Sequence, residues 1–402
     1  MNILFLSLGR YESIKESEGY TDLLREFIRH EDKVYILSPI EKRSGYDTRL
    51  IEEENSIILW VKTGNITKTK LIEKGISTLM IESQFLNAIK KYFSDVHFDL
   101  VLYPTPPITF VKVVEYIKKR DGAKTYLLLK DIFPQNAVDI GMMTTGGLKG
   151  FLYKYFRNKE KKLYKISDTI GCMSPANVQY VLDHNPEIDR DKVEICPNVI
   201  EVVDKSISIE ARRNIREKYG IPVDKKVFVY GGNLGRPQGI DFLIKCLESQ
   251  KNNQDVFFFI VGDGTDYGKL EEYYKQSNQS NFKLMKRLPK EDYDTVVAAC
   301  DVGLIFLDHR FTIPNFPSRL LGYIQAKLPV LACTDPNTDI GKVITEGNFG
   351  WWCESNNVDH FNDLIHEATH AETRALGEIA YQYLQDNYTV ELGYKIIQKR
   401  LK

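Results

Sequence analysis

Short apolar runs alternate with amphipathic stretches through the first half of the chain. Residues 3–8, 98–103 and 123–129 are apolar runs with the length of buried strands. Residues 20–29 and 108–119 instead carry apolar side chains at helical spacing. Strands that alternate with helices predict a parallel, doubly wound α/β sheet.

Polar residues follow two of these predicted strands. Gly9 comes directly after the first strand, and Lys130 and Asp131 come directly after the strand at 123–129. In a doubly wound sheet, ligands bind beyond the carboxyl ends of the strands. We therefore expect Gly9, Lys130 and Asp131 to share one functional edge.

The same pattern restarts after a less regular stretch at 199–208. Residues 227–230, 256–261 and 302–306 are again short apolar runs between amphipathic stretches. The last stretch has helical spacing and no further strand to pair with. We therefore expect three parts: a first domain at 1–198, a second at 199–374 and terminal helices at 375–402.

The composition is that of an ordinary soluble protein. The chain has 402 residues, of which 43% are apolar and 27% are charged, with a formal net charge of −1. This charge balance gives no global attraction to nucleic acid or to a membrane, so any such attraction must be local. We find no signal-peptide pattern and no apolar run near the roughly 18 residues that span a bilayer.

Two sets of potential metal ligands are present, and neither predicts a metal site. Six cysteines are spread along the chain without a CxxC pair, which favours reduced, buried thiols. Residues 366–370 match the HExxH zinc motif, but no third ligand is evident and the stretch follows the second predicted sheet. We expect a solvent-facing helix there.

A glycine-rich junction at 231–239 joins a predicted strand to a predicted helix. Glycines allow a positive φ and a close approach of the backbone to a ligand, and Arg236 could neutralise a phosphate. The junction is neither a P-loop nor a GxGxxG fingerprint. An ordinary strand-to-helix turn is the alternative interpretation.

A second candidate phosphate site lies at 315–319, directly before a short apolar helix. The amino end of a helix exposes unpaired N–H groups and a partial positive charge. With the hydroxyl of Ser318 and the guanidinium of Arg319 added, this loop could hold a diphosphate. The alternative is a Ser318 N-cap beside a surface arginine.

The most basic stretch of the chain is 147–166, where cations alternate with apolar and aromatic residues. On a helix this pattern gives an apolar face bordered by cations, which suits an anionic membrane surface. The alternative is an amphipathic helix that packs on the core with a solvated charged side. The candidate membrane cations are Lys154, Arg157, Lys159, Lys161 and Lys162.

Seven motifs occur here in the order that one known family has them. They are the turn at Gly9, Lys130-Asp131-Ile132-Phe133-Pro134, Met173-Ser174-Pro175, Cys196-Pro197-Asn198, the glycine loop 231–239, Leu288-Pro289 and the stretch 315–330. On these motifs the chain resembles, over nearly its whole length, the family 4 glycosyltransferases of the GT-B fold. The subgroup that it resembles builds capsular, O-antigen or exopolysaccharide repeat units on a lipid carrier.

The resemblance implies an architecture and a reaction. Two Rossmann-like domains face a central cleft, the first binding the acceptor and the second the sugar nucleotide, and the terminal helices pack back toward the first domain. A sugar moves with retention from a nucleotide-diphosphate sugar, with UDP as the expected nucleotide, to a lipid-linked saccharide in bacterial surface polysaccharide synthesis. The resemblance implies neither a cofactor, a metal nor nucleic acid. It places the enzyme in the cytoplasm, peripherally at the inner membrane surface.

The resemblance also implies roles for single residues. Asp131, Lys130 and Arg319 are the candidate catalytic residues, and Gly9 and Arg10 lie on the acceptor side. The implied donor contacts are Gly232, Asn233, Gly235, Arg236, Gln238, Arg287, Leu288, Asn315, Ser318, Arg319 and Tyr323.

Three positions depart from the family pattern. Many members carry a pair of glutamates that contact ribose and sugar, where this chain has Pro314 and Gly322, and a histidine where it has Lys130. Gln325 or Asn315 could replace the glutamates in part. A nucleotide-sugar epimerase of GT-B fold and a non-catalytic partner subunit are therefore alternatives, and the sequence leaves the oligomeric state open.

Overall fold

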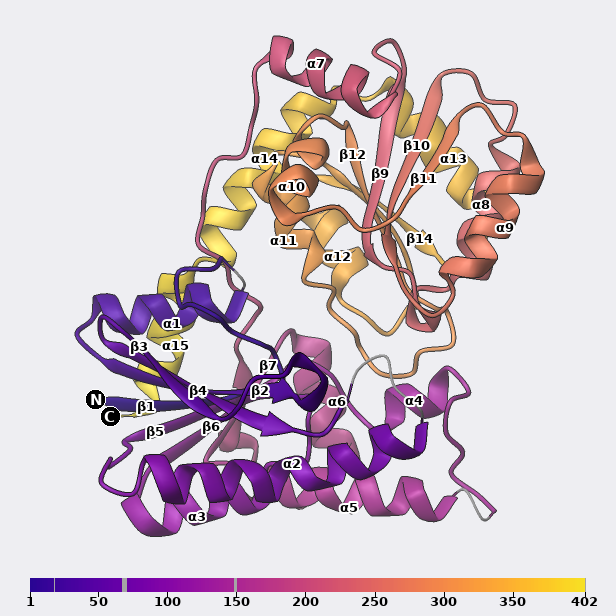
Figure 1. The fold of residues 1–402 in the computed structure, drawn as a ribbon. Coiled ribbons are helices and arrows are strands. Elements are labelled where there is room, and N and C mark those ends of the chain that lie inside the picture. Colours follow the sequence, from indigo (N-terminus) through magenta and orange to yellow (C-terminus); the bar gives the residue numbers. More distant parts are fainter. Residues whose placement is uncertain (18, 67–70, 148–149, 402) are drawn as a thin grey trace. The chain divides into compact units, whose positions relative to one another are not determined.

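The computed structural model describes residues 1–17, 19–66, 71–147 and 150–401, without the side chains of 71–76. The chain divides into two compact units, each built on one sheet (Figure 1). The first unit contains Met1–Glu201 and Val390–Lys402, and the second contains Val202–Thr389.

The first unit is built on a sheet of eight strands. They are β1 (Asn2–Leu6), β2 (Lys33–Glu41), β3 (Arg49–Glu53), β4 (Ser56–Thr63), β5 (Leu100–Pro104), β6 (Lys124–Leu129), β7 (Thr169–Cys172) and β8 (Val193–Ile195). Their spatial order is β3-β4-β2-β1-β5-β6-β7-β8, and only the β3–β4 pair is antiparallel. Strands β5 and β7 are buried along their whole length, as expected for parallel strands covered on both faces.

Helices cover both faces of this sheet (Figure 1). On one face α1 (Gly19–Arg29) packs against α15 (Val390–Lys399), with the rings of Phe27 and Tyr394 5.0 Å apart. The remaining helices of this unit are α2 (Leu71–Tyr92), α3 (Val111–Asp121), α4 (Gln135–Asp139), α5 (Gly150–Ile166) and α6 (Pro175–His184). Of these, α2, α3 and α5 run along the other face of the sheet (Figure 1).

The second unit is built on a fully parallel sheet of six strands. They are β9 (Lys226–Asn233), β10 (Val256–Asp263), β11 (Phe282–Met285), β12 (Val302–Phe306), β13 (Val330–Thr334) and β14 (Gly350–Glu354), in the order β11-β10-β9-β12-β13-β14. Its helices are α7 (Ile209–Tyr219), α8 (Ile240–Ser249), α9 (Tyr267–Ser277), α10 (Lys290–Ala298), α11 (Arg319–Gln325), α12 (Ile340–Glu346), α13 (Val358–His370) and α14 (Thr373–Asn387). The parallel sheets of both units agree with the predicted fold class.

The division of the chain differs from the expected one in two places. The first unit extends to Glu201, three residues past the predicted boundary at 198. Of the stretch 375–402, only α15 belongs to the first unit, where Gly393 lies against Val199. Helix α14 stays with the second unit, because Gly377 fits against the Lys327 carbonyl with no room for a Cβ atom.

The antiparallel strand β3 has no counterpart among the strands that the apolar pattern predicts. It is an edge strand with no buried residue, so it gives no apolar run. All six cysteines are buried and none forms a disulfide, as expected. Within the described ranges, no helix is long and apolar enough to cross a membrane.

A buried ion pair joins α7 to the sheet of the second unit. The Arg216 side chain is 3% exposed and donates to Asp301 at 2.6 Å. It also donates to the carbonyls of Ala299, Pro222 and Lys225. The guanidinium thus fixes three segments at once.

We expect Arg216→Leu to lower the free energy of unfolding of the second unit by about 3 kcal/mol, because it leaves the Asp301 carboxylate buried with less compensation. Urea unfolding of the full chain measures this. The control is Arg213→Leu on the same helix, where the side chain is 70% exposed. Equal stability of the two variants would contradict the assignment.

Candidate functional site

Tyr323 of α11 holds the glycine loop after β9 in place. The Tyr323 hydroxyl accepts a hydrogen bond from the Gly231 N–H at 3.1 Å and donates one to the Leu304 carbonyl at 3.1 Å. Its ring lies against Gly303, where a Cβ atom would overlap it. The Tyr323 side chain is only 1% exposed, so it supports the loop from the core. The sequence analysis instead expected Tyr323 to contact the sugar-nucleotide donor.

Gln238 orders the loop itself, at the end of the 3-10 turn η3 (Arg236–Gln238). The Gln238 Oε1 atom accepts hydrogen bonds from Asn233 Nδ2 at 3.0 Å and from the Gly235 N–H at 3.2 Å. Gly232 has a φ of +118°, a conformation that favours glycine. Gly232 and Arg236 are exposed, so the loop presents bare backbone and one cation to the solvent.

Arg319 lies directly beside this loop. Its guanidinium carbon is 4.2 Å from the centre of the Tyr230 ring, in a cation–π contact. Its Nη2 atom would be only 3.5 Å from a Cβ atom at Gly232. The Nη1 atom is buried and has no hydrogen-bond partner in the part of the chain that the structure describes.

The electrostatic surroundings of Arg319 consist of tyrosine side chains. Burial lowers the pKa of Arg319, whereas Tyr230 and Tyr323 raise it, and the resulting pKa lies above its usual value. The guanidinium therefore stays charged. Arg319 pairs with no carboxylate in the described ranges, and a buried cation without one costs solvation free energy, which a bound anion would offset.

The other expected donor contacts lie in loops near the same edge of the sheet. Arg287 is exposed and Leu288 is half-buried, just after β11, and the loop that contains Asn315 and Ser318 follows β12. These strands are parallel, so their carboxyl ends share one edge. The exposed Ser318 occupies the N-cap position of α11, but its hydroxyl makes no capping hydrogen bond.

In the first unit, Asp131 follows the carboxyl end of β6. Its Oδ2 atom accepts a hydrogen bond from Asn136 Nδ2 at 2.7 Å, whereas its Oδ1 atom is buried without a partner among the described residues. Burial raises the pKa of Asp131 to about 6. A carboxyl with this pKa can exchange a proton near neutral pH.

Lys130 points away from the solvent. Its Nζ atom donates to the carbonyls of Cys196 at 3.3 Å and Pro197 at 3.2 Å, and burial lowers its pKa. These contacts anchor the loop after β8, so the geometry supports a positioning role.

The two acceptor-side residues have different surroundings. Gly9 is required because a Cβ atom there would meet the Tyr11 ring. Its carbonyl accepts a hydrogen bond from Ser38. Arg10 is exposed, pairs with Glu12 at 2.6 Å and lies over the ring of Trp60.

Three of the five expected membrane cations are in ion pairs. Arg157 pairs with Glu160, Lys159 with Glu82 and Lys161 with Glu187, at 2.5, 3.5 and 3.0 Å. Lys154 and Lys162 are exposed. The structure does not describe residues 148 and 149 of the basic stretch.

The HExxH stretch lies at the end of α13, with His366 and His370 exposed and their ring centres 4.5 Å apart. No group of three potential metal ligands occurs among the described residues. The sequence analysis missed Tyr230 and Asn136, which hold Arg319 and Asp131. The available signals were positions in the sequence. Tyr230 directly precedes the glycine pair 231–232, and Asn136 lies five residues after Asp131.

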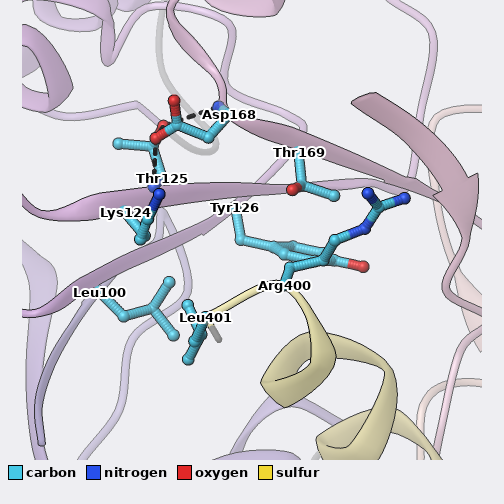
Figure 2. Close-up of a pocket in the computed structure, with 8 residues that line it drawn as sticks. All are labelled: Leu100, Lys124, Thr125, Tyr126, Asp168, Thr169, Arg400 and Leu401. Carbon is cyan, nitrogen blue, oxygen red and sulfur yellow. Dashed lines mark hydrogen bonds between the residues drawn. The ribbon is translucent and has the colours of Figure 1, made fainter. Parts of the chain in front are cut away.

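A separate hollow of about 180 Å³ opens on the first unit (Figure 2). Its lining includes Leu100, Lys124 and Thr169, which begin β5, β6 and β7, together with Arg400. This is the amino edge of the sheet, opposite the edge that carries Asp131. The hollow is therefore separate from the candidate site.

Two parallel-sheet α/β units with polar groups at the carboxyl edges of their sheets agree with the GT-B fold, which solved structures share with this chain. In the sequence comparisons, residues 211–383 match the model of the glycosyl transferases group 1 family. This match, which lies within the second unit, confirms the resemblance described above, and the chain is a glycosyltransferase.

Two relatives and one solved structure illustrate the likeness. WbjE of Pseudomonas aeruginosa, named as a glycosyltransferase, is 26% identical over 80% of this chain and 78% of its own length. WcaI of Escherichia coli K12, named for colanic acid biosynthesis, is 21% identical over 61% and 60%. The structure of Anabaena HepE with UDP and glucose has a TM-score of 0.72 at 13% identity, covering 100% and 99% of the two chains.

We expect Asp131→Asn to stabilise the first unit at pH 7.5. The pKa of Asp131 is higher in the folded chain, at about 6, than its ordinary value of 3.8. The ionised carboxylate therefore destabilises the fold above pH 6, and this cost disappears as the pH falls toward 4. Thermal unfolding should show a gain of about 2–3 kcal/mol at pH 7.5 that shrinks at pH 5. A gain that does not depend on pH would exclude this cause.

Proposed function

We propose that this glycosyltransferase moves a sugar from a nucleotide-diphosphate sugar, with UDP as the nucleotide, to a lipid-linked saccharide. The single observation that carries the proposal is the Arg319 guanidinium, whose buried Nη1 atom has no hydrogen-bond partner and which pairs with no carboxylate among the residues that the structure describes. The product would be a repeat unit of a bacterial surface polysaccharide such as a capsule or O-antigen, as the family resemblance implies, and the name of WcaI refers to one polysaccharide, colanic acid.

The second unit would bind the donor. Gly232 exposes its backbone next to Arg319, and Arg236 and Ser318 are exposed at the same edge. A diphosphate offers several oxygen acceptors to a guanidinium fork. As the glycosidic bond breaks, negative charge grows on the diphosphate, and a cation already in place stabilises it. The UDP in the HepE structure supports the choice of nucleotide.

The first unit would bind the acceptor and supply the proton acceptor. The unbonded Oδ1 atom of Asp131 and its pKa of about 6 suit a group that takes a proton from an attacking hydroxyl. Lys130 would hold the adjacent loop. We propose transfer with retention, as the family resemblance implies, by an enzyme located in the cytoplasm and peripherally bound to the membrane that carries the acceptor.

We expect Arg319→Ala to lower the rate of sugar transfer, because the transition state loses a preorganised cation that stabilises it by about 2–4 kcal/mol. The stability of the folded chain should change little. Arg319→Lys should recover part of the activity, since it keeps the charge but loses the fork. Turnover is followed by release of nucleotide from UDP-sugars with membrane extract as acceptor source, and Arg213→Ala is the exposed control. Near-wild-type turnover of Arg319→Ala would contradict the assignment of Arg319 to the donor diphosphate. Epimerisation of the sugar without transfer would support the epimerase alternative.

Activity should survive EDTA, because cationic side chains would neutralise the diphosphate without a metal ion. The measurement is nucleotide release before and after chelation, with the metal-restored sample as control. Loss of activity that only magnesium reverses would indicate a metal-bound diphosphate instead.

A further inference from the structure

The outward side of helix α5 exposes a cluster of large apolar side chains. Phe151 is 77% exposed, more than any other large apolar side chain in the described ranges, and Leu152 and Tyr155 are 49% and 36% exposed. Met142, in the loop before the helix, is 67% exposed. Residues 151, 152 and 155 lie at helical spacing on one side of α5. We call the side chains of Phe151, Leu152 and Tyr155 the apolar face.

The same side of the helix becomes cationic toward its carboxyl end. Lys162 and Lys165 are exposed, about two and three turns beyond Tyr155. The only acidic residue in the helix is Glu160, which is 2% exposed and bonded to Arg157 and Tyr164. The helix itself therefore presents apolar side chains and exposed lysines outward, while the exposed Glu187, from outside the helix, pairs with Lys161.

The inward side of α5 is fixed to the segment that carries Asp131. The rings of Phe156 and Phe133 are 5.0 Å apart, and the Tyr153 hydroxyl donates to Gln135 at 3.3 Å. This segment also contains Asn136, the hydrogen-bond donor to Asp131. The apolar face consequently cannot turn inward to bury itself without breaking the support of Asp131.

We propose that the apolar face inserts into the surface of an anionic lipid bilayer while Lys162 and Lys165 lie over its headgroups. An exposed apolar face followed by exposed lysines, on a helix whose single acidic residue is buried, complements anionic lipid more closely than a protein surface of mixed charge. This inference rests on the proposed function, because docking through α5 would bring the segment of Asp131 to the depth at which a lipid-linked acceptor arrives. It differs from the polybasic expectation, since Lys159 and Lys161 are held in ion pairs.

The test is co-sedimentation of the full chain with vesicles of phosphatidylcholine containing about one-third phosphatidylglycerol, at low and high salt. Phe151→Asp with Leu152→Asp should reduce binding at least tenfold at both salt concentrations. Lys162→Gln with Lys165→Gln should weaken binding roughly fivefold per lysine at low salt only. The matched control is Ile209→Asp, at a 70% exposed apolar residue that also begins a helix, and it should bind like the wild type.

Undiminished vesicle binding by the double aspartate variant would overturn the proposal. So would a concentration-dependent dimer of the wild type, measured by analytical ultracentrifugation, that this variant abolishes, because the face would then be a protein interface. Calorimetry with UDP separates the two claims. UDP binding without vesicle binding would contradict only the proposed lipid-binding face. Vesicle binding without UDP binding would contradict only the proposed donor site.

Discussion

The cation–π contact between Arg319 and Tyr230 determines what the candidate site can do. A carboxylate would fix the guanidinium but would also neutralise it and occupy its N–H donors. An aromatic face holds the guanidinium plane through the ring quadrupole and leaves the in-plane donors available. The 4.2 Å contact thus fixes a cation while preserving its capacity for an anion, which is the property that a diphosphate site requires.

The surrounding backbone is built so that this contact can form. Tyr323 packs where Gly303 has no side chain, and Tyr293 packs where Gly231 has none. The Tyr323 hydroxyl then links β9 to β12 through two hydrogen bonds. Two glycines therefore provide space for two tyrosines, and the packed tyrosines position the glycine loop relative to Arg319. A larger residue at either glycine would move the cation together with the loop.

The sequence predicted the parallel sheets, because strands and helices are recognised from local pattern, and it selected Arg319 and Asp131 as candidates that remain predictions. It did not predict that Tyr323 is a support or that Lys130 bonds to the loop after β8, since both depend on contacts distant in sequence. The basic stretch showed the same limit. Periodicity identified a helix with cations, but only the fold shows that Lys159 is paired with Glu82 while Phe151 is left exposed.

In each unit, the buried polar atoms without a partner among the described residues include one at a candidate catalytic residue, Arg319 Nη1 in one unit and Asp131 Oδ1 in the other. Such atoms cost stability, because a buried donor or acceptor without a partner has lost its water. The two atoms differ in the charge that they favour: Arg319 stays positive, whereas burial moves Asp131 toward its protonated form. A cation that never loses its proton suits a leaving diphosphate, and an acid that exchanges its proton near pH 6 suits an attacking hydroxyl. In the proposed reaction, the two costs would lie at the leaving diphosphate and at the attacking hydroxyl, which is the pattern expected when stability is given up for catalysis.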